Sequence, residues 1–386
     1  MTSDHMTPMR GAPPSRMEDP SHMREAVELA ARGWGQVSPN PLVGAVVAQG
    51  GEVVGRGWHA EFGGEHAEVM ALREAGRRAM GATLYATLEP CKHEGHTPPC
   101  VEAIRRAGIR RVVIASRDPH LNAGGGAEVL REAGLDVEIG LEARSAKRLN
   151  ASFLWFHATG TPFASLKLAL SMDGRLGAPG VRTAVTGPRS WEEVHRLRAS
   201  HDAVLIGRGT VDVDDPLLTA RGESAPRRPP VRIVLDSELH LSLMSQLVRT
   251  VDQAPVWVVG DPDFEGFGGR AAELQSAGVD VIPVPREAGH TLKVEQIWNR
   301  LAERGVLSVL VEGGGRVASA LLRSRRIQRL HAFVAPMFLG SDGVPGFPDL
   351  DPSEPGEWRA VERAAIGPDT RIVLEHRALD DVLEPL

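Results

Sequence analysis

The sequence predicts an α/β protein of two domains, and three observations carry this prediction. The chain has 386 residues, whereas a single hydrophobic core rarely grows beyond about 250–300 residues, so more than one domain is expected. Short apolar runs alternate with helical signals, which predicts sheets covered by helices on both faces. The alternation forms two different series, the first of which closes near residue 145.

The first series begins with a helix from Ser21, where apolar residues recur at helical spacing after Pro20. Two apolar runs separated by Gly50-Gly51 then predict a β-hairpin over residues 42–57. Alternating helices and strands are expected after it, at 67–76, 83–87, 101–107, 111–115, 127–133 and 137–139.

The second series predicts strands at 163–170, 203–206, 231–235, 256–259, 279–284, 308–311 and 330–335. A stretch rich in Pro and Arg at 221–230 is expected to be a loop. We therefore predict a disordered extension over 1–19, a first domain over 20–145, a linker over 146–161 and a second domain over 162–386.

The composition argues against several classes of protein. The formal charge is 44 − 50 = −6 and only 4% of residues are aromatic, so neither nucleic acid nor a membrane surface is an expected partner. No apolar stretch approaches the ~18 residues of a membrane span, and no export signal is present, so a cytoplasmic protein is expected. Two cysteines are too few for a disulfide framework in a chain of this length.

The two cysteines instead join a pattern that predicts a catalytic zinc site. GGEHAE places His66 two residues before Glu68, and LEPCKHEGHTPPC places Cys91 and Cys100 after the next strand. One imidazole and two thiolates leave an open position on zinc for water, and an H-x-E glutamate serves as proton shuttle in zinc deaminases. We expect His66 and Glu68 in the first turn of one helix and Cys91 at the opening of the next helical region, so that helix N-termini stabilise the thiolates.

These residues have two other interpretations. A surface histidine with two structural or free thiols accounts for each residue singly, but not for the joint pattern. A purely structural zinc is disfavoured because such a site normally recruits four protein ligands.

Residues 20–140 resemble the deaminase half of the bifunctional riboflavin-biosynthesis deaminase/reductase family. The segments that carry this resemblance are SPNPLVGAVV, GWHAEFGGEHAE, YATLEPCKHEGHTPPC and AGIRRVVIASRDP. The resemblance implies a three-layer, cytidine-deaminase-like fold, with Zn²⁺ on His66, Cys91 and Cys100 and with Glu68 as the catalytic residue. It also implies that Asn40 and His93 contact the pyrimidine. The chain departs from the family at DPHLNAGGGAE, where His120 replaces an Asn, which puts phosphate or loop contacts there in doubt.

Two glycine-bearing strand ends in the second domain suggest a phosphate-binding edge. The run VLVEGGGRVASALL leads from a strand through Gly313–Gly315 into a helix, and GRGTVDVDDP follows another strand. Backbone N–H groups at such turns bind phosphate, although a plain tight turn is the alternative reading. Arg198 and Arg221 are candidates for bidentate pairing with a substrate phosphate. The alternative for each is a solvated position on the surface. The Rossmann spacing G-x-G-x-x-G is not met.

Five segments of the second domain resemble, in order, the reductase half of the same family, whose fold is similar to dihydrofolate reductase. They are LKLALSMDGR, VTGPRSWEEVHRLRA, DAVLIGRGTVDVDDPLLTAR, RIVLDS and VLVEGGGRVASALL. The resemblance implies an NADPH site lined by Ala184, Thr186, Thr210, Asp214, Ser237, Gly314, Gly315, Arg316, Val317, Ala318 and Ser319. It implies substrate contacts from Lys167, Arg182, Arg198, Leu218, Arg221 and Glu312, with Asp173 beside Lys167 at the cleft. Ala184 stands where the family usually has a Trp that contacts the nicotinamide cofactor, so cofactor affinity or the preference for NADPH over NADH is expected to differ.

The expected function is two consecutive steps of riboflavin biosynthesis on a phosphorylated ribosylaminopyrimidine. The first domain would remove the 2-amino group as ammonia, and the second would reduce the ribosyl chain to ribityl with NADPH. A zinc deaminase of nucleosides or tRNA with a passive second domain is the alternative enzyme, and a zinc-stabilised binding protein is the alternative without catalysis. Family members associate, so a homo-oligomer is expected.

Overall fold

The computed structural model describes residues 17–93, 98–120, 123–222, 225–287, 291–348, 350 and 357–384. Residues 1–16 of the expected disordered extension lie outside this description. The described chain forms two compact units: residues 17–33 with 42–149, and residues 34–41 with 150–384. The short segment 34–41 therefore packs with the second unit although it falls within the span expected for the first domain.

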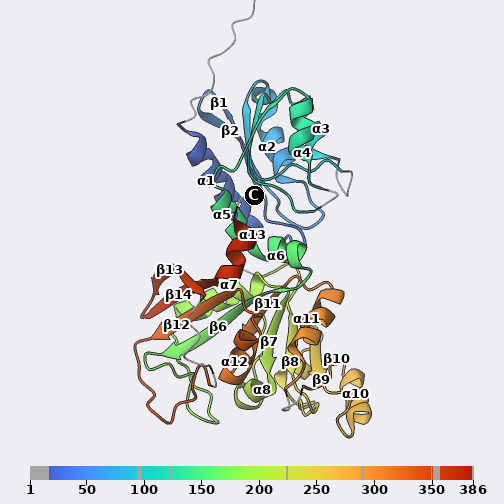
Figure 1. The fold of residues 1–386 in the computed structure, drawn as a ribbon, viewed down its shortest axis with the longest axis vertical. Helices are drawn as coiled ribbons and strands as arrows, with labels where there is room; N and C mark the ends of the chain where they lie inside the picture. The colour runs from blue at the N-terminus through green and yellow to red at the C-terminus, as the bar shows by residue number, and fades with distance from the viewer. Residues whose placement is uncertain are drawn as a thin grey trace, which may run out of the picture. The chain divides into compact units, whose positions relative to one another are not determined.

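The first unit is built on a five-stranded mixed sheet in the order β2-β1-β3-β4-β5 (Figure 1). Its strands are β1 (Gly44–Gln49), β2 (Glu52–Trp58), β3 (Thr83–Leu88), β4 (Arg111–Ser116) and β5 (Asp136–Ile139). β1 pairs antiparallel with β2 and β3, while β3, β4 and β5 are parallel. Gly50 and Gly51 both have positive φ angles in the turn between β1 and β2, as two-residue hairpin turns require.

Helices cover both faces of this sheet, which confirms the predicted three-layer architecture. Apolar residues of α1 (Asp19–Ala30) and α5 (Ala143–Leu149) pack with one set of strand side chains. Residues of α2 (Ala67–Ala75), α3 (Cys100–Arg106) and α4 (Gly126–Glu132) pack with the alternate set. The 3₁₀ turns η1 (Ala31–Gly33) and η2 (Gly76–Ala79) extend α1 and α2.

A buried ion pair fixes the start of α1 to the sheet. The guanidinium of Arg111 on β4 donates to both carboxylate oxygens of Asp19, at 3.0 and 2.6 Å, and the Tyr85 hydroxyl donates to the same carboxylate at 2.5 Å. Burial alone would raise the pKa of Asp19, but the hydrogen bonds from Arg111 and Tyr85 outweigh it and hold this pKa below its usual value. The pair is therefore charged at neutral pH and satisfies three buried polar side chains at once.

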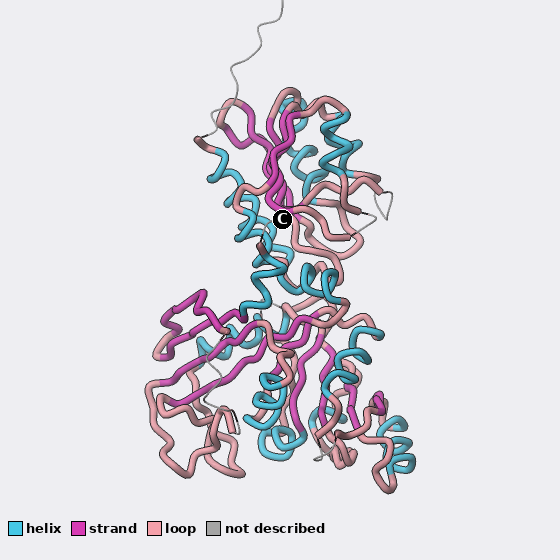
Figure 2. Tube along the Cα trace, in the orientation of Figure 1, coloured by secondary structure: helices cyan, strands magenta, loops and turns pink. Residues whose placement is uncertain are grey.

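The second unit contains a nine-stranded sheet in the order β10-β9-β8-β7-β11-β6-β12-β14-β13. Its strands are β6 (Phe163–Ser171), β7 (Ala203–Gly207), β8 (Val231–Leu235), β9 (Val256–Gly260), β10 (Asp280–Pro283), β11 (Ser308–Glu312), β12 (Arg329–Ala335), β13 (Trp358–Ile366) and β14 (Asp369–His376). All pairings from β10 to β12 are parallel, and β14 and β13 add an antiparallel edge. Figure 2 draws the strands of both sheets in magenta.

Helices also cover both faces of the larger sheet. One face packs against α7 (Pro188–Ala199), α9 (Gln246–Arg249) and α10 (Phe267–Ser276). The other packs against α11 (Val294–Glu303) and α12 (Gly315–Arg323). The remaining helices of this unit are α6 (Ala151–Thr159), α8 (Arg208–Asp214), η3 (Arg377–Leu379) and α13 (Asp380–Leu383). Among the described residues, no helix has the length and apolar character needed to cross a membrane.

Two features differ from the sequence expectations. The stretch 146–161 was expected to be a linker, but most of it is helical: it contains the end of α5 and all of α6. The strands β13 and β14 were also not expected. WRAVERAAI of β13 is rich in helix-forming Ala, Arg and Glu, and its pairing with β14 outweighs this local preference at the sheet edge. DTRIVLEH of β14 does contain the strand-forming residues Thr370, Ile372 and Val373, a signal that the sequence interpretation missed.

Candidate active sites

The first candidate site is a metal centre in the first unit. The ligand atoms of His66, Cys91 and Cys100 all lie within 4.8 Å of one another, and no other such group occurs in the part of the chain that the structure describes. His66 Nδ1 lies 3.1 Å from Cys100 Sγ and 3.5 Å from Cys91 Sγ. Ligand atoms around a tetrahedral zinc stand about 3.5 Å apart, so one imidazole and two thiols at these distances suit Zn²⁺ with one open position.

Helix starts place two of the three ligands. His66 is the residue that precedes α2, and Cys100 is the first residue of α3. Cys91 lies in the loop that follows β3, so the expectation that it opens a helical region was wrong. The helix contact it does make is with α3, because the backbone N–H of Cys100 donates to Cys91 Sγ at 3.4 Å. Hydrogen bonds from Cys100 and His66 lower the pKa of Cys91, which favours a thiolate at this position.

A glycine on β2 lets α2 begin close to the sheet. A Cβ atom built on Gly57 would lie 2.1 Å from the carbonyl oxygen of Ala67, which is too close for any side chain. The absence of a side chain at Gly57 thus sets how near the first turn of α2, with His66 and Glu68, approaches the strand.

Glu68 lies in the first turn of α2 with only 3% of its surface exposed. Burial raises the pKa of its carboxyl, and its neighbours include His66 and the thiol of Cys100. A buried carboxyl with a raised pKa beside the metal ligands has the properties of a group that accepts and returns a proton near neutral pH.

His59 is a residue near the metal centre that the sequence interpretation missed. Its ring meets the ring of His66 edge-on, with 5.7 Å between centroids, and it is 3% exposed. Its Nδ1 lies 3.1 Å from the carbonyl oxygen of Glu65. The signal was present, since GWHAEFGGEHAE contains both histidines, but nothing in the spacing showed that the two rings touch.

The other residues expected around the pyrimidine are less closely defined. His93 is exposed and is followed by residues 94–97 of the same loop, which lie outside the described residues. Asn40 belongs to the segment 34–41 that packs with the second unit. The carbonyl oxygen of His120, the residue that departs from the family pattern, accepts the backbone N–H groups of Ala123 and Gly124.

The second candidate site lies at the carboxyl ends of the adjacent parallel strands β7 and β11. Each strand runs into a helix through glycine: Gly207 precedes α8, and Gly314 precedes α12. The N–H of Gly314 donates to the Thr210 hydroxyl at 3.3 Å, so the two turns touch. Ser319 is 1% exposed, and its hydroxyl has no hydrogen-bond partner among the described residues. Two adjacent helix starts at the carboxyl ends of parallel strands fit the phosphates of a dinucleotide, whereas the buried Ser319 hydroxyl is not available to a ligand.

The remaining residues expected at the cofactor are distributed around these turns. Asp214 ends α8 and Ser237 follows β8, the strand next to β7. Gly315 to Ser319 form the first turns of α12. Thr186 and the exposed Ala184 lie in the loop between β6 and α7.

Three residues expected to meet the substrate come together beside this edge. Lys167 on β6 and Glu312 on β11 are paired across the parallel ladder, and Arg198 on α7 holds Glu312. Arg198 Nε lies 2.6 Å from one oxygen of Glu312, and one terminal nitrogen lies 2.8 Å from the other. Burial lowers the pKa of Lys167, against the opposing effect of Glu312.

This arrangement corrects the role expected for Arg198. Its remaining terminal nitrogen donates to the carbonyl oxygen of Thr219 at 3.2 Å, so each of the three guanidinium nitrogens has a partner within the protein. Glu312 occupies the Nε edge, which is therefore not available for the bidentate phosphate contact that the sequence suggested. Its geometry is that of a residue that orients Glu312.

The other expected substrate residues are not equally placed. Leu218 is 2% exposed and packs in the core with a positive φ, so its side chain is not available to a ligand. Arg182 and Arg221 are exposed. Asp173 serves the fold: it accepts the Ser171 hydroxyl and the N–H groups of Leu339 and Gly340, which lowers its pKa to about 2.

Fold and sites together define a class: a two-domain α/β protein with a deaminase-type zinc centre in one domain and a reductase-type sheet in the other. Residues 16–116 match the family described as the cytidine and deoxycytidylate deaminase zinc-binding region, and residues 162–372 match the RibD C-terminal domain. The chain belongs to the RibD family of bifunctional deaminase/reductases of riboflavin biosynthesis.

Full-length relatives support the assignment. The riboflavin biosynthesis protein RibD of Bacillus amyloliquefaciens is 38% identical, over 91% of this chain and 94% of its own length. The Escherichia coli protein is 37% identical, over 92% and 98%. Among solved structures, RibD of Acinetobacter baumannii superposes with a TM-score of 0.82 at 33% identity, over 94% of this chain and 99% of its own. A deaminase/reductase of Thermotoga maritima gives 0.79 at 34% identity, over 92% and 98%.

Proposed function

We propose that residues 20–145 hydrolyse the 2-amino group of 2,5-diamino-6-ribosylamino-4(3H)-pyrimidinone 5′-phosphate and that residues 162–386 then reduce its ribosyl chain, giving 5-amino-6-ribitylaminouracil 5′-phosphate. The observation that carries the proposal is the cluster of His66, Cys91 and Cys100 beside the buried carboxyl of Glu68. The Thermotoga maritima relative is described as a diaminohydroxyphosphoribosylaminopyrimidine deaminase and 5-amino-6-(5-phosphoribosylamino)uracil reductase, which supports the same pair of steps here.

In the deaminase, His66, Cys91 and Cys100 would hold Zn²⁺, which when bound supplies the Lewis acidity that makes water a nucleophile near neutral pH. Glu68 takes a proton from the attacking water and delivers it to the departing amino nitrogen, so that ammonia leaves and a carbonyl oxygen remains on the ring. Its raised pKa suits both transfers, because the carboxyl can be protonated and deprotonated within one turnover. Asn40 and His93 would contact the pyrimidine.

In the reductase, the two glycine turns, with Thr186, Asp214, Ser237 and the start of α12, would hold NADPH, which when bound supplies a hydride for C1′ of the ribosyl chain. Lys167 and Glu312 would contact that chain, with Arg198 fixing the direction of the Glu312 carboxylate. The lowered pKa of Lys167 makes its ammonium a better acid, which suits it to supply the proton that accompanies the hydride.

A coupled assay tests the proposal. Purified protein is given the diaminopyrimidine substrate and NADPH, and ammonia release and the loss of NADPH absorbance are followed together. Both signals are expected, at a ratio of one to one when the substrate is exhausted. Ammonia release without NADPH oxidation would show that the protein is a deaminase but not a reductase. The absence of both signals would favour the alternative of a zinc-stabilised binding protein.

Two expectations stay predictions from the sequence: the homo-oligomer and the cytoplasmic location. Sedimentation of the purified protein and fractionation of cells that express it would test them.

A further inference from the structure

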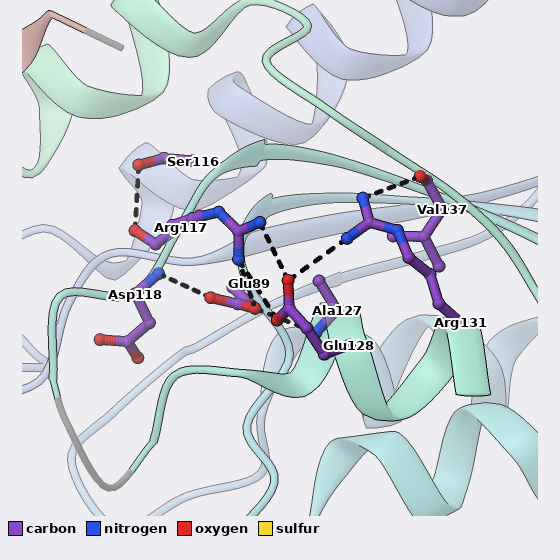
Figure 3. A network of polar contacts seen from close by, with 8 residues as sticks. All are labelled: Glu89, Ser116, Arg117, Asp118, Ala127, Glu128, Arg131 and Val137. Atoms are coloured by element: carbon purple, nitrogen blue, oxygen red, sulfur yellow. Dashed lines mark hydrogen bonds and ion pairs between the residues drawn. The ribbon is translucent and has the colours of Figure 1, made fainter. Parts of the chain in front are cut away.

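A buried carboxylate, Glu89, lies two residues before the zinc ligand Cys91. Only 1% of its side chain is exposed, and both of its oxygens accept backbone hydrogen bonds. One oxygen accepts from the N–H of Asp118 at 3.2 Å and the other from the N–H of Ala127 at 2.9 Å (Figure 3). Glu89 therefore ties the chain just before Cys91 to the segment that runs from the end of β4 into α4.

The residues on either side of Cys91 contact the same segment. The N–H of Glu89 donates to the carbonyl oxygen of Ser116 at 2.9 Å, and the N–H of Lys92 donates to that of Ala123 at 3.4 Å. Between them, Pro90 lies against Gly126, where a Cβ would approach the Pro90 carbonyl oxygen to 1.8 Å. The backbone around Cys91 is thus held at Glu89, Pro90 and Lys92 by residues of the described parts of the segment 116–127, namely Ser116, Gly126 and Ala123.

The glycines of this segment now have a structural explanation. Gly124 has no room for a Cβ, which would lie 2.7 Å from the carbonyl oxygen of Asp118. Gly125 has a φ of +90°, which disfavours other residues, and Gly126 is excluded from substitution by Pro90. Gly126 thus packs against Pro90 and Gly125 against the Lys92 side chain, while Gly124 packs within its own segment.

Cys91 is held from its other side by α3. Its carbonyl oxygen accepts the N–H of Val101 at 3.3 Å, and its Sγ accepts the N–H of Cys100 at 3.4 Å. The loop that holds Cys91, here called the ligand loop (residues 89–92), lies between two supports: α3 on one side and the segment 116–127 on the other. Removing either support frees the loop to shift its thiolate, and metal sites lose affinity when such outer contacts are lost.

Charge around Glu89 is balanced by an exposed arginine that is shared with a second carboxylate. Arg117 lies 3.7 Å from Glu89 and 3.0 Å from Glu128, and Arg131 also contacts Glu128 at 3.3 Å. Glu128 is half exposed and contacts the side chains of Arg117 and Arg131, whereas Glu89 is buried and accepts hydrogen bonds from two backbone N–H groups (Figure 3). The two carboxylates share one network but differ in whether they reach the ligand loop.

We propose that Glu89 is a positioning residue of the zinc centre, which fixes Cys91 by clamping its loop to the segment 116–127. The proposal rests on the proposed zinc deaminase and adds a residue that touches neither metal nor substrate. Its consequence is that zinc retention depends on Glu89 and on Gly126, while the reductase reaction does not.

The test compares Glu89→Gln with the matched variant Glu128→Gln in the full-length zinc-loaded protein. Gln has the shape of Glu, but its NH₂ group faces a backbone N–H and cannot accept from it. Zinc release to a chromogenic chelator is expected to be about 10- to 100-fold faster for Glu89→Gln and unchanged for Glu128→Gln. The visible absorption bands of the cobalt(II)-substituted protein are expected to shift in Glu89→Gln alone, because they report ligand geometry.

NADPH oxidation with the deaminated substrate serves as the internal control for folding and is expected to stay at the wild-type rate. Gly126→Ala acts on the same loop through Pro90 and is expected to reproduce both effects, which keeps the test decisive if Glu89→Gln folds poorly. Wild-type zinc release and cobalt bands in both variants would overturn the positioning role. A wild-type protein that binds no zinc would instead overturn the proposed deaminase on which this role depends.

Discussion

Arg198 and Glu312 form a two-pronged ion pair between α7 and the carboxyl end of β11, with N–O distances of 2.6 and 2.8 Å and with both side chains less than 10% exposed. The pair directs a carboxylate toward the same edge as Lys167, with which Glu312 is in register. Because Glu312 occupies the Nε edge of the guanidinium, we expect Arg198 to act on the reaction through Glu312.

Replacing Arg198 with Lys should therefore damage the reductase alone. A lysine keeps the charge but cannot form two parallel hydrogen bonds, so Glu312 loses its fixed direction. We expect kcat for NADPH oxidation to fall about 10- to 100-fold with little change in KM for NADPH, while ammonia release is unaffected. Arg300→Lys, in an exposed pair with Glu303, is the control. Wild-type NADPH oxidation in Arg198→Lys would show that this pair is only structural.

Glu68→Gln isolates the proton transfer from metal binding. The variant keeps the size of the side chain but cannot carry a proton, so ammonia release should fall about 10²- to 10⁴-fold. Zinc content, measured by elemental analysis, should equal that of the wild type because Glu68 is not among the three ligands. Glu102→Gln, an exposed position on α3, should leave both unchanged. Undiminished ammonia release in Glu68→Gln would favour a binding protein over a deaminase.

The buried pair of Asp19 and Arg111 makes the stability of the first unit depend on pH. The pKa of Asp19 is lowered in the folded protein, against about 3.9 in an unfolded chain, so the pair stabilises the fold above that pH. This contribution is lost as the pH falls through the lowered folded value. We expect Asp19→Ala to cost about 3 kcal/mol at pH 7, with the difference from wild type shrinking below pH ~4.

Thermal unfolding followed by calorimetry across this pH range checks the prediction. Glu25→Ala removes a partly exposed partner of Arg56 and should change stability by no more than about 0.5 kcal/mol at any pH. A difference between wild type and Asp19→Ala that is constant from pH 7 to pH 3 would rule out the charged pair as the source of stability.

Ala184→Trp tests the departure from the family at the cofactor. An aromatic ring at this exposed loop position should add a contact to the nicotinamide and lower KM for NADPH about 3- to 10-fold, with kcat nearly constant. Ala178→Trp, at another exposed position of the same loop, should leave KM for NADPH unaltered. An unchanged KM in Ala184→Trp would mean that position 184 does not face the cofactor.

Much of the fold followed from local sequence signals, because strands and helix starts have short-range causes. The hairpin at Gly50-Gly51, the alternating elements and the grouping of His66, Cys91 and Cys100 are all confirmed. The strand β13 escaped prediction because its helix-forming residues form a strand only through pairing with β14, whereas the Thr, Ile and Val of β14 were a strand signal that was missed.

Side-chain partners distant in sequence could not be predicted in the same way. Arg198 and Glu312 are 114 residues apart in the chain, so the sequence suggested a phosphate contact for an edge of Arg198 that Glu312 occupies in the fold. Glu89 carries no motif of its own, and its clamp on Asp118 and Ala127 appears only when β3 and β4 lie side by side. The sequence likewise did not show that Gly126 packs against Pro90, next to the zinc ligand Cys91.

The claim that one chain performs both reactions is tested most directly by the coupled assay on Cys91→Ser beside the wild type. The wild type should release ammonia and oxidise NADPH in equal amounts from the diaminopyrimidine. Cys91→Ser should lose zinc and ammonia release, yet oxidise NADPH at the wild-type rate when supplied with the deaminated intermediate. Ammonia release by a zinc-free Cys91→Ser protein, or failure of the wild type to oxidise NADPH with that intermediate, would contradict the account.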